Sequence, residues 1–155
     1  MHLSKFTDFS LRVLIYLATQ PARMSTIQEI SDRYGLSKDH LRKIVHHLAQ
    51  QGWIDSRRGR GGGLLLAKDP AEISIGAVAR GVEEDLVIVE CFDAAHDTCQ
   101  ISGVCRLSGM LQEALAAFLA VLDGYTLADV VAGQMALLAR LGFSPDGRPL
   151  KELRP

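Results

Sequence analysis

The fold is decided by residues 25–66, which read STIQEISDRYGLSKDHLRKIVHHLAQQGWIDSRRGRGGGLLL. Two overlapping capping-box patterns at the start of this stretch predict a short helix over residues 27–34. Gly35 supplies a turn, Ser37 is placed to cap a second and longer helix, and Gly52 follows the end of that helix. Two short helices joined by a glycine-containing turn predict a helix-turn-helix.

The second of these helices has an apolar side and a polar side. Its predicted inward stripe is Leu41, Ile44, Val45 and Leu48, and its predicted outward face carries Lys38, Asp39, His40, Arg42, Lys43, His46 and His47. Such a face has the length, the charge and the hydrogen-bonding groups to enter a major groove. We therefore expect DNA contacts from Ser37, Lys38, His40, Arg42 and Lys43.

A β-hairpin is predicted directly behind the second helix. Residues 53–57 alternate between apolar and polar, a glycine-rich turn follows, and residues 64–66 return as an apolar strand. Arginine is favoured in a narrow minor groove, so Arg57, Arg58 and Arg60 are expected DNA contacts at the tip of this wing. The turn lacks the order G-x-x-x-x-G-K-[ST], which argues against a nucleotide site.

Charge is distributed unevenly along the 155 residues. Residues 1–70 hold 11 Lys and Arg against 6 Asp and Glu, whereas residues 71–155 hold 6 against 12. A basic half joined to an acidic half indicates that the first half meets a polyanion. The chain shows no signal pattern, no membrane-length apolar run and an odd number of cysteines, so we expect a cytoplasmic protein that meets no membrane.

All three cysteines lie in residues 91–105, here called the cysteine loop, which reads CFDAAHDTCQISGVC. Thiolates select zinc, copper(I) or iron–sulfur clusters. The spacing C-x₇-C-x₅-C is wider than a zinc knuckle and could surround a cluster, which would need a fourth donor. Zinc with His96 as fourth ligand, and a redox-active or structural thiol group, stay open from the spacing alone.

The remaining elements are mostly helical, so the predicted fold class is mainly α: a winged helix-turn-helix with a long C-terminal dimerisation helix. Helices are predicted over residues 3–19, 73–82, 106–122 and 126–140. The helix at 106–122 has two apolar stripes, one for its own domain and one most economically for a second subunit. The expected organisation is a DNA-binding unit (1–70), a short helix with the cysteine loop (71–105), packing helices (106–141) and a mobile tail (142–155).

The sequence resembles a bacterial family of iron–sulfur-dependent, Rrf-type winged-helix repressors, most closely its nitric-oxide-responsive branch. The resemblance covers residues 1 to about 132. It is carried by residues 3–12 (LSKFTDFSLR), by Leu36-Ser37, by residues 57–63 of the wing, by the three cysteines before a long helix, and by residues 122–129 (LDGYTLAD).

This resemblance implies an iron–sulfur cluster, of the [4Fe–4S] kind and one per subunit, held by Cys91, Cys99 and Cys105. It also implies a homodimer that binds palindromic double-stranded promoter DNA and responds to nitric oxide. A sister branch completes its site with a histidine at the position of Ser108, so this chain departs from that branch. Asp8, from the first helix of the partner subunit, is the first choice for the fourth ligand. The rivals are Asp93, His96 and Asp97 in the loop, or an external ligand.

Three functions compete at this level. The main hypothesis is a DNA-binding repressor that is not an enzyme, because no catalytic constellation is visible. A thiol-based sensor that oxidises its cysteines is an alternative within the same class. A small iron–sulfur electron carrier is the alternative from another class, and the basic helix and the wing argue against it.

Overall fold

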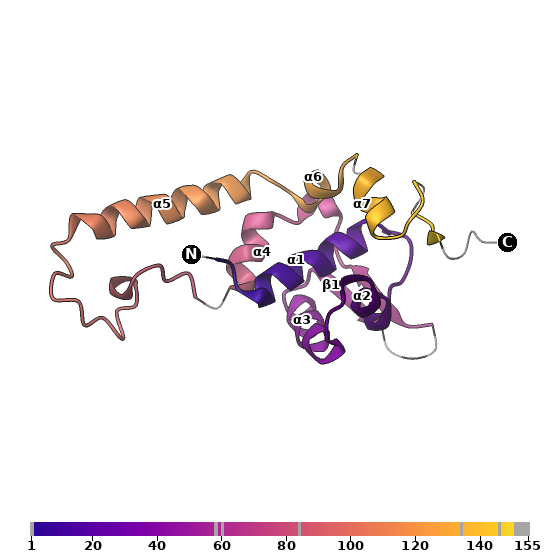
Figure 1. Ribbon diagram of the computed structural model, residues 1–155, viewed down its shortest axis with the longest axis horizontal. Helices are drawn as coiled ribbons and strands as arrows, with labels where there is room; N and C mark the ends of the chain where they lie inside the picture. Colours follow the sequence, from indigo (N-terminus) through magenta and orange to yellow (C-terminus); the bar gives the residue numbers. More distant parts are fainter. Residues whose placement is uncertain are drawn as a thin grey trace.

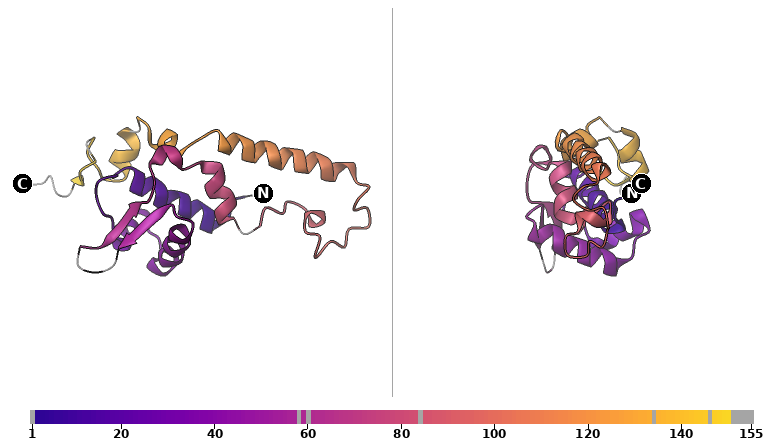
Figure 2. Two further views of the ribbon diagram at one scale, coloured as in Figure 1. Left: turned by 180° about the vertical axis from the view of Figure 1, so that it is seen from behind. Right: turned by 90° about the vertical axis from the view of Figure 1, so that its left-hand side faces the viewer.

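Helix α1 (Lys5–Ala18) runs through the middle of the molecule, and the other elements of the DNA-binding unit are arranged around it (Figure 1). The computed structural model describes residues 2–150 apart from 58, 60, 84, 134 and 146. Two regions are distinct in Figures 1 and 2. A body, residues 4–83 and 126–150, packs around α1, and an arm, residues 85–125, extends away from it.

The core of the body forms because α1 is apolar on most sides. Val13, Leu14 and Leu17 are at most 2 % exposed. Ser4 caps the helix, since its hydroxyl accepts a hydrogen bond from the backbone N–H of Thr7 at 3.1 Å. The helix therefore begins at Lys5 rather than at the predicted residue 3, because an N-cap residue has extended rather than helical backbone.

The predicted helix-turn-helix is present as α2 (Ile27–Tyr34) and α3 (Lys38–Gln50). Thr26 forms the predicted capping box with Glu29. Gly35 is left-handed between the two helices. The predicted inward stripe of α3 is confirmed, since Leu41, Ile44, Val45 and Leu48 are all buried.

The wing is an antiparallel pair of strands, β1 (Ile54–Arg57) and β2 (Gly63–Leu66), in which Ile54 pairs with Leu66 and Arg57 with Gly63. A backbone bridge also joins Ser25 to Leu64, with N···O distances of 3.0 and 2.7 Å. Because Ser25 immediately precedes the cap of α2, this bridge ties the wing to the helix-turn-helix. The predicted winged-helix fold is thereby confirmed.

Helix α4 (Ile75–Val82) follows the wing after a short 3₁₀ turn, η1 (Pro70–Glu72). Ile73, Ile75 and Val78 are buried against the core. The chain then enters the arm through η2 (Glu90–Phe92) and the cysteine loop, and returns along α5 (Arg106–Asp123). Arg80 of α4 pairs with Asp123, which fixes the end of α5 to the body.

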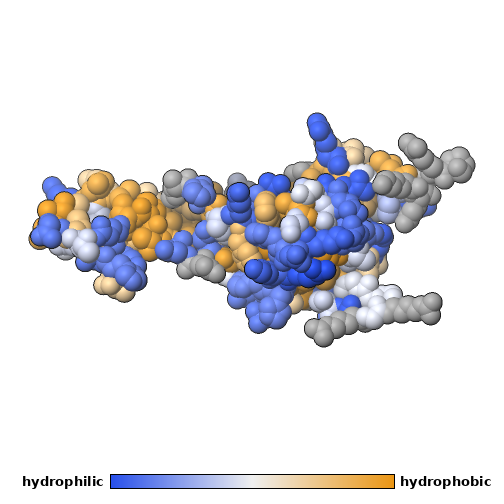
Figure 3. All heavy atoms as spheres, turned by 60° about the horizontal axis from the view of Figure 1, so that its bottom comes forward, coloured by the Kyte–Doolittle hydropathy of each residue, from blue (hydrophilic) through white to orange (hydrophobic). Residues whose placement is uncertain are grey.

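The arm has no buried residue, although much of it is apolar. Among its large hydrophobic side chains Val104 is 81 % exposed, and Leu107, Met110, Val121 and Tyr125 are each more than half exposed. Figure 3 shows hydrophobic residues along the arm and hydrophilic residues over the body on the side of α3. Of the two predicted stripes of α5, the first (Leu107, Leu111, Leu115, Phe118 and Leu122) is half-buried on its own chain except at Leu107, which is exposed. The second (Met110, Ala114, Ala117 and Val121) is exposed throughout.

The single helix predicted over residues 126–140 is wrong in one respect, because it is two helices, α6 (Leu127–Val131) and α7 (Met135–Arg140). Gly133 has a φ of +62°, which cannot continue a right-handed helix. The break lets α6 pack Leu127 into the core while α7 takes another direction.

Residues 142–145 and 147–150, expected to begin a mobile tail, belong to the packed body. Phe143 is 3 % exposed and its ring centroid lies 5.5 Å from that of Tyr16 on α1. Phe143 also forms a bridge with Pro149. The rest of the predicted tail, residues 151–155, lies outside the described residues. Among the helices that the structure does describe, none is both long and apolar enough to cross a bilayer.

Candidate nucleic-acid interface and cysteine loop

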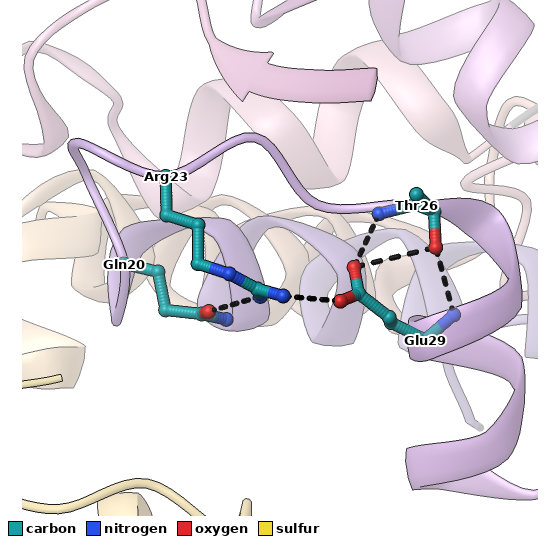
Figure 4. Close-up of polar contacts among 4 residues, drawn as sticks. All are labelled: Gln20, Arg23, Thr26 and Glu29. Atoms are coloured by element: carbon teal, nitrogen blue, oxygen red, sulfur yellow. Dashed lines mark hydrogen bonds and ion pairs between the residues drawn. The ribbon is translucent and has the colours of Figure 1, made fainter. Parts of the chain in front are cut away.

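Helix α2 is held in place by a polar network at its first turn (Figure 4). The carboxylate of Glu29 accepts hydrogen bonds from the backbone N–H of Thr26 at 2.7 Å and from Arg23, whose guanidinium also donates to Gln20 at 2.8 Å. Burial raises the pKa of Glu29, but the Thr26 N–H and the Arg23 guanidinium outweigh it and hold the pKa below its ordinary value of 4.5. The loop before the helix-turn-helix is thus fixed by a charged side chain.

Helix α3 presents a basic face to solvent. Lys38, Arg42, Lys43 and His46 are exposed, and Arg42 pairs with Asp39 one turn before it. Ser37 is the N-cap residue and its side chain makes no capping hydrogen bond. The predicted contacts Ser37, Lys38, Arg42 and Lys43 therefore lie together on one accessible surface.

His40 and His47 do not lie on that surface, contrary to the predicted outward face. The His40 ring packs against Phe6 and Phe9, with centroids 6.0 and 5.4 Å apart, and its Nε2 is buried. His47 packs edge-on against Phe6 at 5.6 Å. Both histidines flank the buried stripe of α3, so the α1–α3 contact covers them. His40 is consequently a packing residue rather than a base-reading one in this conformation.

The wing arginines are placed only in part. Arg57 is exposed and donates to Asp55 on the same strand at 3.1 Å. The other two predicted contacts, Arg58 and Arg60, lie outside the described residues.

The three cysteines have free thiols and are half-buried on the arm, at the end remote from α3 (Figure 1). The Sγ of Cys91 donates a weak hydrogen bond to the Oγ of Ser108 at 3.7 Å. The beginning of the cysteine loop thus lies against the first turn of α5. Cys105 is the N-cap residue of α5, so the last thiol of the loop also belongs to this junction.

The acidic and imidazole groups of the loop are engaged in local turns. Asp93 pairs with the Nδ1 of His96 at 2.6 Å, and Asp97 accepts a hydrogen bond from the backbone N–H of Cys99 at 3.0 Å. Glu90 accepts one from the N–H of Thr98 at 2.6 Å, which closes the first half of the loop. The three rival fourth ligands are therefore used to shape the loop.

The donor set fits a thiolate-bound metal group by its chemistry, since three free thiols share one irregular segment. The fold of this chain alone does not bring these donors together around one metal site. No group of three His, Cys, Asp or Glu side chains is gathered for a metal ion in the described part of the chain. Asp8 is on α1 in the body, where its carboxylate pairs with Arg12 at 2.7 Å. The chain thus supplies donors that the described residues do not bring together.

Glu83 is a functional candidate that the sequence did not reveal. It belongs to the acidic triplet Glu83-Glu84-Asp85, which suggests a solvated patch. Its side chain instead accepts hydrogen bonds from Ser4 and Thr7 at the start of α1. No local pattern signals this, because 76 residues separate Thr7 from Glu83.

Comparison with known proteins places the chain in a class. The model of the Rrf2 family, described as "Iron-dependent Transcriptional regulator", matches residues 3–133. The chain belongs to the Rrf2 family of transcriptional regulators and is not an enzyme.

Within this family the chain is close to regulators named NsrR. It is 49% identical over 142 residues to the HTH-type transcriptional regulator NsrR of Bacillus subtilis, covering 91% of this chain and 97% of the relative. It is 46% identical over 144 residues to the NsrR of Shouchella clausii, covering 92% and 97%.

Solved structures share the fold. CymR, the global cysteine regulator of B. subtilis, has a TM-score of 0.70 at 24% identity and covers 85% of this chain and 97% of its own. The T. potens IscR has a TM-score of 0.68 at 23% identity, with coverage of 84% and 86%. These similarities support the winged-helix architecture alone.

Proposed function

We propose that this chain is a nitric-oxide-responsive repressor. As a homodimer it binds palindromic promoter DNA while each subunit holds an iron–sulfur cluster, of the [4Fe–4S] kind by resemblance to its family. It releases DNA when nitric oxide reacts with the cluster. The observation that carries the proposal is the presence of three free, half-buried thiols within one short segment of the arm of an Rrf2-family chain. The relatives named NsrR support the particular branch.

DNA binding rests on the exposed basic face of α3 and on the wing. Lys38, Arg42 and Lys43 can reach phosphates or base edges, and Arg57 continues the basic surface along β1. Phosphate contacts make affinity fall steeply with salt. An electron carrier needs no such surface, so a steep salt dependence on duplex DNA separates the two functions.

The homodimer rests on an exposed apolar surface along α5 and its two flanking residues, here called the seam: Val104, Leu107, Met110, Ala114, Ala117, Val121 and Tyr125. All seven are exposed and none is charged. The large side chains stand at both ends and alanines in the middle. When the seam is reversed about Ala114, Leu107 falls opposite Val121 and Val104 close to Tyr125. Such a self-complementary face suits an antiparallel, two-fold contact with a second copy.

The ligands of the cluster are proposed to be Cys91, Cys99 and Cys105 of one subunit and Asp8 of the other. Within one subunit α1 lies in the body and the cysteine loop in the arm (Figure 1), so Asp8 of the same chain is badly placed. An antiparallel seam brings the loop of one arm toward the body of the partner. A carboxylate binds cluster iron less firmly than thiolate does and leaves iron accessible to nitric oxide.

The Asp8 carboxylate is already engaged in an ion pair with Arg12. It is held by the Nε and the terminal nitrogen of Arg12, at 3.0 and 2.7 Å. Binding a metal would require Asp8 to leave that ion pair. Because both side chains are about 40–45 % exposed, the pair is screened by water and can be exchanged at modest cost.

The deciding experiment is purification without oxygen, with an absorption spectrum, iron and sulfide counts, and DNA binding before and after addition of nitric oxide. We expect a coloured dimer whose affinity for its promoter falls on addition of nitric oxide. A colourless, iron-free protein that still binds its promoter tightly would contradict the proposal. Oxidised cysteines with no iron would point to the thiol sensor instead.

Variants assign the fourth ligand. Asp8→Ala is expected to change the cluster spectrum and the response to nitric oxide. Asp97→Ala is the matched control, since it removes a carboxylate from the loop itself. An unchanged spectrum for Asp8→Ala and a changed one for Asp97→Ala would assign the ligand to the loop.

A further inference from the structure

The last turn of α4, residues 81–83, contacts α1, the recognition helix α3, and Trp53, the residue just before the wing. We call this turn the α4 junction. Glu83 binds the start of α1, and Gly81 contacts both α3 and the first residue before the wing. Only eight residues further along the chain lies Cys91. The α4 junction is therefore the point at which the N-terminal side of the cysteine loop is attached to the body, whereas its C-terminal side returns through α5.

Glu83 closes the first turn of α1 with a full set of charged hydrogen bonds. Its Oε1 accepts from the backbone N–H of Ser4 at 3.0 Å, and its Oε2 accepts from the Ser4 hydroxyl at 3.1 Å and from the Thr7 hydroxyl. The Ser4 oxygen remains free to accept from the Thr7 N–H as the helix cap. Thr7 is fully buried, and a negative charge at a helix N-terminus is favourable.

Gly81 joins the same turn to the recognition helix. Its carbonyl, at the end of α4 where helical partners run out, accepts a hydrogen bond from the Nε2 of His47 at 2.8 Å. A Cβ at position 81 would stand 2.6 Å from the ring of Trp53, so only glycine lets the turn approach this closely. His47 in turn packs on Phe6 of α1. Helices α1, α3 and α4 thus form a closed ring of contacts at this turn.

The segment beyond the junction is held only loosely to the body. No described residue between Glu83 and Cys91 is buried. Leu86, Val87 and Ile88 line an open groove of about 520 Å³ that also touches His2, Leu3 and α5. The open groove leaves room for the cysteine loop to move. Going back along the chain from Cys91, Glu83 is the first residue of the body, so such a movement acts on the body there first.

We propose that Glu83 is a positioning residue for DNA binding: it couples the state of the cysteine loop to the orientation of α3 through Ser4, Thr7 and the Gly81–His47 hydrogen bond. This inference rests on the proposed function for the DNA site and for the loop. It assigns a role to an acidic residue that contacts neither. Coupling of this kind is a difference in DNA affinity between two states of the loop.

The test compares Glu83→Gln with Asp85→Asn, which neutralises a nearby carboxylate that accepts a hydrogen bond from the backbone N–H of Val87. A glutamine at position 83 has one acceptor oxygen where Glu83 has two. Its NH₂ group, itself a donor, would face the donor groups of Ser4 and Thr7. DNA affinity is measured for each protein with and without the cluster. We expect the ratio of the two affinities to be at least about 5-fold in the unaltered protein and in Asp85→Asn, and to fall toward one in Glu83→Gln.

A second readout does not depend on the cluster. Amide hydrogen exchange of the metal-free protein is expected to rise about tenfold in the first turn of α1 and the last turn of α3 in Glu83→Gln, and not in Asp85→Asn. If the unaltered protein shows no effect of the cluster on DNA affinity, the proposed function fails while the exchange data still decide on the junction. Unchanged exchange in α3 together with an unchanged affinity ratio would overturn the inference.

Two further variants separate positioning from simple loss of stability. Thr7→Val removes one donor to Glu83 and keeps the shape of a buried side chain, so it should weaken the coupling even if Glu83→Gln does not fold. His47→Gln can still donate to the Gly81 carbonyl and should retain the coupling, whereas His47→Ala should lose it. Equal behaviour of the two His47 variants would contradict the proposed route to α3.

Discussion

The arm is more apolar in sequence than the body, yet only the body buries its apolar side chains. Every buried residue of the described chain lies outside residues 84–126. Leu14, Leu41 and Leu48 are fully enclosed, whereas Leu107 and Met110, on a helix of similar regularity, are 58 and 63 % exposed. The difference shows that the residues of the same chain leave one face of α5 uncovered. Its stability as a packed element depends on what covers the seam.

The largest loss of stability is expected from truncating a side chain in the core. Leu41→Ala is expected to lower the free energy of unfolding by about 2–5 kcal/mol, because it removes a buried side chain and leaves a cavity. Leu107→Ala on the seam should act only through association. Thermal unfolding at several protein concentrations checks this, since the loss in Leu41→Ala should persist on dilution and that in Leu107→Ala should shrink. A concentration-independent loss in Leu107→Ala would show that the seam is packed within one subunit.

A charge on the seam should separate the subunits. Val121→Asp is expected to give a monomer in analytical ultracentrifugation, because an antiparallel contact desolvates the carboxylate without a partner. Its promoter affinity should fall, since one subunit reads only one half-site. Gln112→Asp, on the opposite side of α5, is the control and should leave the dimer intact. Dimers from both variants would exclude the seam as the interface.

Removing one phosphate-binding cation from the body should have a smaller and uniform effect. Lys43→Ala is expected to weaken binding to all DNA sequences alike and to reduce the slope of log affinity against log salt by about one. Arg140→Ala, an exposed cation on α7, should change neither quantity. Titrations of duplex DNA at several salt concentrations measure both, and equal slopes for Lys43→Ala and the unaltered protein would remove Lys43 from the interface.

The smallest expected effect concerns the network before α2. The pKa of Glu29 is below its ordinary value of 4.5 in the folded chain. The contribution of Glu29 to stability is therefore present above pH 4.5 and is lost as the pH falls through the pKa of Glu29 in the folded state. Melting temperatures of the unaltered protein should decline more steeply below pH 4.5 than those of Glu29→Gln. Parallel curves would mean that the Arg23–Glu29 pair adds no measurable stability.

The helix-turn-helix and the wing were predictable because their signals are local. A capping box at Thr26, a left-handed glycine at position 35 and an apolar stripe on α3 each act within a few residues. The break after α6 could not be predicted because the apolar pattern continues across it. In the structure it consists of the extended backbone of Ala132 and the positive φ of Gly133. The pattern fixed which side chains are apolar, but not whether the helix is continuous.

The candidate site divides in the same way. That Cys91, Cys99 and Cys105 share a short segment is visible in the sequence. The sequence did not show that the side chains of His40 and His47 turn inward. The residue types on a helix face do not reveal which neighbouring element packs against that face. Phe6 and Phe9 of α1 cover these two rings. Asp8 was identified by resemblance, and its ion pair with Arg12 became visible only with side chains in place.

The sequence by itself determined the DNA-reading elements, the cysteine loop and the apolar seam, because each depends on periodicity or spacing within a single segment. Only the tertiary structure decided that Glu83 caps α1, that Gly81 binds His47, and that the arm stands apart from the body with its seam uncovered. These contacts join residues 34 to 79 positions apart. Their geometry follows from how whole helices pack, which no local pattern encodes.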